Sequence, residues 1–141
     1  MRARAALPPA LGAALLIAGC GPAAGGDSAG EFTGPAREVA ATVEALQEAA
    51  GARDAQRICA RVLAPDVLRR MRAAGTSCVP AVEDALLSVD VTELTVREGQ
   101  VRVQGPTASA RVTVGNGENP TVTTFQLIRA RDGWRIAGFG A

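Results

Sequence analysis

The apolar run that ends at Cys20 constrains this chain more than any other feature of its sequence. Arg2 and Arg4 precede the run, and residues 5–19 are uncharged and mostly apolar. This stretch is too short for an ordinary membrane-spanning helix, which needs about 20 residues. A positive start, an apolar centre and small residues at the end predict a secretory signal peptide. The run therefore separates a removable leader from the part of the chain that folds.

The last four residues of this stretch, Ile17-Ala18-Gly19-Cys20, resemble the lipobox of bacterial lipoproteins. In that family a diacylglyceryl group is attached to the cysteine sulfur, the chain is cut before the cysteine, and the new amino end is usually acylated. The resemblance implies a leader over residues 1–19 and a protein held at the extracytoplasmic face of the cell membrane by lipid on Cys20. Two acyl chains anchor a protein stably, whereas one does so only marginally. A plain cleaved signal peptide and an uncleaved membrane segment are the alternatives.

The mature chain divides into a tether and one domain. Residues 20–34 are rich in glycine and other small residues without hydrophobic periodicity, which predicts a flexible lipidated tether. Phe32 is the exception, and is where we expect the chain first to touch the domain. Residues 35–141 are enough for one domain with one core.

The domain changes its hydrophobic period near Ser88. Before that residue, apolar side chains such as Val39, Val43 and Leu46 recur at helical spacing, and further helices are expected near residues 54–63, 65–74 and 77–88. After it, apolar and polar residues alternate. Strands are expected near residues 94–103 (a hairpin or bent pair), 108–114, 124–127 and 134–139, with Asp132-Gly133 as a hairpin turn. Helices followed by consecutive antiparallel strands predict an α+β fold.

With this order, residues 35–139 resemble the nuclear-transport-factor-two-like, or SnoaL-like, cone fold, in particular small actinobacterial lipoproteins of that type. The motifs that carry the resemblance are Gly51-Ala52-Arg53-Asp54-Ala55 with Ile58-Cys59, then Thr76-Ser77-Cys78, and the closing stretch Leu127-Ile128-Arg129-Ala130-Arg131-Asp132-Gly133-Trp134-Arg135-Ile136. The resemblance implies helices packed on the concave face of a curved antiparallel sheet, with a pocket between them. Enzymes of that superfamily use histidine, tyrosine or aspartate in the pocket, and this chain has no histidine and no tyrosine.

The three cysteines have separate expected roles. If Cys20 is acylated, Cys59 and Cys78 remain, and two cysteines outside the cytoplasm are expected to form a disulfide. A redox or thiol-nucleophile pair is the alternative. The sequence has neither a Cys-x-x-Cys spacing nor a histidine that would lower a thiol pKa, which favours a structural bond.

Composition excludes several kinds of chemistry. The absence of histidine and lysine removes the usual catalytic triads, a P-loop and a Schiff base, and too few soft ligands remain for zinc. We therefore expect no catalytic triad, no metal and no cofactor. Without its leader the chain carries 13 arginines and 14 acidic residues, so it has no overall basic character for nucleic acid. The acidic pairs Glu83-Asp84 and Asp90-Glu93 are candidates for acid/base work, although such pairs are typical of solvated surface.

The strand pattern gives four candidate pocket residues, which are Phe125, Leu127, Arg129 and Trp134. If their face is the concave one, Arg129 points to the pocket mouth and binds an anionic ligand. The alternative is that the apolar residues belong to the core and that Arg129 extends to water at a strand end. Arg69-Arg70-Arg72 is a second positive group, which suits either an anionic partner or ordinary solvent exposure.

Two kinds of function follow. The first is a non-catalytic module that binds a small apolar or anionic ligand, or a protein partner in the cell envelope. The second is a cone-fold isomerase, dehydratase or hydrolase that uses a buried carboxylate. A homodimer formed through the sheet is a further expectation from the resemblance.

Overall fold

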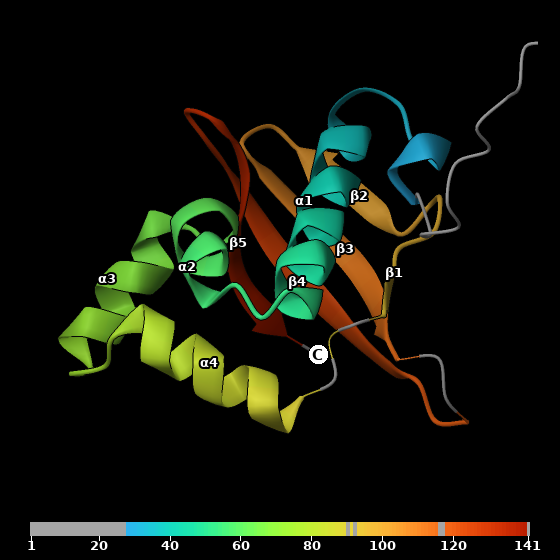
Figure 1. Cartoon of the computed structure of the whole chain (residues 1–141). Coiled ribbons are helices and arrows are strands. Elements are labelled where there is room, and N and C mark those ends of the chain that lie inside the picture. Colours follow the sequence, from blue (N-terminus) through green and yellow to red (C-terminus); the bar gives the residue numbers. More distant parts are fainter. Residues whose placement is uncertain (1–27, 90, 92, 116–117, 141) are drawn as a thin grey trace, which may run out of the picture.

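The helical pattern after Pro35 forms one long helix, α1 (Gly34–Gly51), with that proline in its first turn. The protein is described by a computed structural model that covers residues 28–89, 91, 93–115 and 118–140, so Cys20 lies outside the described residues. Val39, Val43 and Leu46 are buried along one side of α1, as their spacing predicts. In Figure 1, α1 lies across the sheet and covers its middle.

Shorter helical segments surround α1. They are the 3-10 turn η1 (Ser28–Glu31), α2 (Ala55–Arg57), the π-helical turn η2 (Ile58–Val62), α3 (Pro65–Ala73) and α4 (Cys78–Ser88). Asp54 caps α2, because its side chain accepts a hydrogen bond from the backbone N–H of Arg57 at 2.9 Å. The helices predicted over residues 54–88 are therefore present, with the second one widening into a π-turn.

The strands form one open antiparallel sheet. They are β1 (Leu94–Thr95), β2 (Val101–Gln104), β3 (Thr107–Val114), β4 (Thr121–Ala130) and β5 (Gly133–Gly140), in the order β1-β3-β4-β5, with β2 also paired to β3. The first two strands pair with successive halves of β3 and not with each other, so the predicted hairpin is wrong and the chain forms a bent pair of strands. Together with the preceding helices, the sheet confirms the predicted α+β class.

One face of the sheet supplies most of the core. Ala110 and Val112 of β3 and Leu127 of β4 are fully or almost fully buried, and they share the face that α1 covers. The opposite face carries mainly threonine, serine, glutamine and arginine at half-buried or exposed positions. This alternation is usual for an antiparallel sheet with one solvated face.

The free edge of β5 is covered by the segment that follows η2. Leu63 forms a parallel bridge with Ile136, and the N–H of Ala64 donates to the Ile136 carbonyl at 2.8 Å. An exposed strand edge would leave these backbone groups unpaired. The π-turn is thereby fixed against the sheet, which matters for the site below.

Packing of the domain begins earlier than the expected boundary at Pro35. Ala29 and Phe32 are each 6% exposed and belong to the main core cluster. The N–H of Ala29 also donates to Glu44 Oε1 at 2.6 Å. The last residues of the expected tether are therefore part of the folded domain.

Helices α3 and α4 lie beside β5 and below α1 in Figure 1. Neither helix has a fully buried residue, and Leu87 near the end of α4 is 73% exposed. Val67 and Leu68 of α3 and Val82 and Leu86 of α4 pack against the core but are only partly buried, so a covalent link adds to the attachment of these helices.

We predict that Phe32→Ala lowers the free energy of unfolding by about 3 kcal/mol, because it removes a buried aromatic side chain and leaves a cavity. Urea unfolding of the full chain measures the change. Glu31→Ala, at an exposed neighbouring position, is the control and is expected to stay within about 0.5 kcal/mol. Equal stability of the two variants would show that Phe32 does not belong to the core.

Candidate functional site

The structure brings Cys59 and Cys78 to disulfide distance, as the cysteine count predicts. Their Cα atoms are 6.1 Å apart, which suits a disulfide. The bond joins the π-turn η2 to the first residue of α4. It therefore ties the loosely packed pair of helices to the body of the domain.

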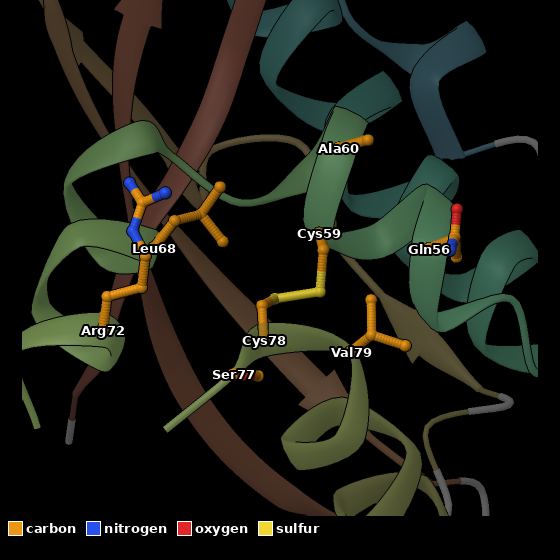
Figure 2. A pocket seen from close by; sticks show the side chains of 8 residues that line it. All are labelled: Gln56, Cys59, Ala60, Leu68, Arg72, Ser77, Cys78 and Val79. Atoms are coloured by element: carbon orange, nitrogen blue, oxygen red, sulfur yellow. A yellow bond between two sulfur atoms is a disulfide. The ribbon is translucent and has the colours of Figure 1, made fainter. Parts of the chain in front are cut away.

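Figure 2 shows this bond in the wall of an open hollow of about 350 Å³. Leu68 and Arg72 lie on one side of the sulfur atoms, and Gln56 and Val79 lie on the other. Arg72 is the one residue among those that line this hollow to carry a charge. The arrangement suits a cross-link more than a site with several groups that recognise a ligand.

A second and more polar hollow, of about 530 Å³, lies where α1 and η2 meet the turn between β4 and β5. We call it the arginine hollow. Its charged and aromatic lining residues are Glu38, Arg61, Arg129, Arg131, Asp132 and Trp134. Its volume falls in the usual range of small-molecule sites, and it is more open to solvent than the hollow beside the disulfide.

The arginine hollow contains two of the four pocket residues predicted from the sequence. Arg129 and Trp134, which are register partners on β4 and β5, both line it. Phe125 and Leu127 lie farther along the same face, buried beneath α1, and they do not line it. The four residues therefore share one face of the sheet, and the position of α1 decides which part of that face stays open.

Arg129 covers Trp134. Its guanidinium carbon is 5.6 Å from the centre of the indole ring, a cation–π distance, and its Nη1 is 3.1 Å from Glu38 Oε2. Trp134 is 3% exposed, and its buried Nε1 donates to no acceptor within the part of the chain that the structure describes. A buried donor without a partner is uncommon in folded proteins.

A hollow of about 410 Å³ adjoins the arginine hollow. The two share Ala45, Arg61 and Asp132, and the adjoining hollow is also lined by Arg57 and Arg135. Arg135 is buried; its Nη1 donates to the carbonyl of Ala60 at 2.8 Å and its Nη2 donates to Asp132. This last hydrogen bond is the main reason why the pKa of Asp132 lies below its ordinary value. Arg135 therefore joins the π-turn to the β4–β5 hairpin.

Positive charge is concentrated in the two hollows. Their lining includes five arginines, at positions 57, 61, 129, 131 and 135, and two acids, Glu38 and Asp132. Arg57 pairs with Glu48, which does not line either hollow, through two guanidinium–carboxylate hydrogen bonds of 3.0 Å. These contacts lower the pKa of Glu48 and raise that of Arg57. Sequence reasoning selected Arg129 alone, because no local pattern links arginines that lie about 70 residues apart.

The other candidates from the sequence remain at the surface. Glu83, Asp84 and Glu93 are exposed, and Asp90 lies outside the described residues. The positive group on α3 is also dispersed: Arg69 pairs with Asp66 at 2.7 Å, whereas Arg70 donates to the carbonyl of Ala137 at 2.9 Å. Two of the three arginines of this group therefore already have partners within the domain.

Two further properties of the described residues concern metal binding and membrane crossing. Within those residues, no group of three or more histidine, cysteine, aspartate or glutamate side chains is arranged to hold a metal ion. No helix in the same part of the chain has the length and apolar character needed to cross a membrane.

Comparison of the chain with family models, with curated proteins and with solved structures returns no match.

We predict that Cys59→Ala lowers the free energy of unfolding by about 3 kcal/mol, because it removes a cross-link between residues 19 apart in sequence. Urea unfolding with and without dithiothreitol measures this effect. The reductant should destabilise the unsubstituted chain by a similar amount and leave Cys59→Ala unchanged. An unsubstituted chain that does not respond to the reductant would contradict a stabilising disulfide.

Proposed function

We propose that this chain is a lipoprotein, anchored through Cys20 at the extracytoplasmic face of the cell membrane, whose domain is a non-catalytic module that binds a small ligand. The observation that carries the binding role is the arginine hollow, in which several positive side chains converge on a space of small-molecule size. The charged start, the apolar run and the small residues before Cys20 support the anchor.

We also propose that the domain belongs to the nuclear-transport-factor-two-like cone folds. The succession of helices and then antiparallel strands supports this assignment, as does the packing of α1 over one face of the sheet. The arginine hollow occupies the side of the sheet on which such a fold has its pocket. A homodimer or an envelope protein partner would use the opposite, polar face, which leaves the hollow accessible.

A cone-fold enzyme is the alternative. The aspartate and glutamate side chains in the described part of the chain favour it less than a binding module. A general base of this kind needs a carboxylate whose pKa is raised by burial. Among the described residues no aspartate or glutamate is buried. Hydrogen bonds from arginine lower the pKa values of Glu48 and Asp132. These acids suit ion pairs with arginine more than proton transfer.

The anchor is tested by Cys20→Ala, which we predict moves the protein from the membrane fraction to the soluble or secreted fraction. The urea midpoint of the domain should not change, because the proposed tether separates Cys20 from the folded domain. Cys78→Ala is the matched control, and should stay in the membrane fraction but unfold at lower urea. A Cys20→Ala protein that remains in the membrane would refute the lipid anchor.

The binding role is tested by filling the arginine hollow. Ala41 is exposed on α1 and lines this hollow, so Ala41→Leu adds bulk there without entering the core. Trp134 is the chain's one tryptophan and lies beneath Arg129 in this wall, so its fluorescence reports changes in the contact with that guanidinium. We predict that small ligands change the emission saturably and that Ala41→Leu weakens them at least about fivefold, a loss of about 1 kcal/mol.

Ala85→Leu makes the same change at an exposed position on α4 and is the control for this measurement. It should leave ligand binding unchanged. If neutral, anionic and cationic small molecules all leave Trp134 emission unchanged, the proposed binding role is wrong.

A further inference from the structure

The arginines of the two hollows differ in how their charge is balanced. Three of them face a carboxylate: Arg57 pairs with Glu48, Arg129 with Glu38 and Arg135 with Asp132. Within the described residues, Arg61 and Arg131 have no carboxylate oxygen within 4 Å of a guanidinium nitrogen. Both of these residues line the arginine hollow.

We infer that the arginine hollow binds a small organic or inorganic dianion, with Arg61 and Arg131 supplying two guanidinium groups that form no ion pair within the described residues. This inference rests on the proposed binding role and names the class of ligand. Carboxylates and phosphates match the planar fork of a guanidinium and accept paired hydrogen bonds from it. A ligand with two negative charges could therefore pair with the two arginines of this hollow that form no ion pair within the described part of the chain.

The walls of the arginine hollow disfavour the apolar ligand that the sequence left open. Trp134 is the aromatic residue of its lining, and the ring is almost completely buried, with Arg129 over its face. A ligand in the hollow therefore meets little free aromatic surface. The remaining apolar contacts come from Ala41, Ala45 and the stems of the arginines, which cover only small areas.

The acids of the same wall disfavour large polyanions. Glu38 and Asp132 have half or more of their side chains exposed, and both line the arginine hollow. An extended anionic surface would approach these carboxylates as well as the arginines, and like charges brought together cost free energy. A compact dianion at Arg61 and Arg131 would cover less of the wall that carries these two carboxylates.

The experiment titrates the mature chain at pH 8 and constant ionic strength, with Trp134 emission as the readout. Succinate and inorganic phosphate are the dianions, butyrate is the monoanion matched to succinate in length, and succinamide is its neutral analogue. We expect saturable binding of at least one dianion, at least about tenfold tighter than butyrate, and no saturation with succinamide.

Arg61→Gln and Arg131→Gln should each weaken dianion binding about tenfold, since each removes one charge-assisted contact. Arg102→Gln, at an exposed position on β2, is the matched control and should change the affinity less than twofold. Urea unfolding of each variant confirms that it is folded. Dianion affinity that does not respond to either substitution would overturn the inference.

The remaining outcomes separate this inference from the proposed binding role. If butyrate or succinamide binds as tightly as the dianions, and Ala41→Leu abolishes that binding, the hollow is a ligand site but the dianion assignment is wrong. If none of the four probes and no other small molecule changes Trp134 emission, both proposals fail.

Discussion

The structure depends first on the burial of one sheet face beneath α1. Val39 and Val43 of α1 and Val112 of β3 are almost completely removed from water, and this transfer of apolar surface is the main force that holds a helix on a sheet. Because α1 covers only the middle of the sheet, the end of the β4–β5 hairpin extends beyond it. The arginine hollow lies in the space that this mismatch leaves, so its position follows from the packing of the core.

A buried guanidinium fixes the shape of that space. Arg135 donates to a backbone carbonyl of η2 and to Asp132, and it therefore joins two parts of the chain that are about 75 residues apart. The wide π-turn presents Ala60 to this contact and Arg61 to the hollow. Turns of this kind are rare in proteins and often occur at functional sites. The same interaction thus stabilises the fold and positions the side chains that face a ligand.

The sequence predicted what depends on local pattern and could not predict what depends on long-range packing. Periodicity located α1, α3 and α4 and the longer strands, and the Asp132-Gly133 pair marked the turn into β5, where Gly133 has a φ of +130°. The apolar side chain of Phe32 likewise marked a contact with the domain, whereas nothing local marked Ala29, which is equally buried. The arginine hollow shows the limit, because Arg61 and Arg131 line one hollow only when η2 is fixed against β5.

The distribution of charge separates anchoring from binding. The mature chain is almost neutral overall, whereas the two hollows carry five arginines against two acids. At physiological ionic strength exposed charges are screened over about 8 Å, so a ligand feels this local excess only when it enters the hollow. In the proposed division of roles, lipid on Cys20 attaches the protein to the membrane and the arginine hollow recognises the ligand, so the local excess of arginine serves binding and not attachment.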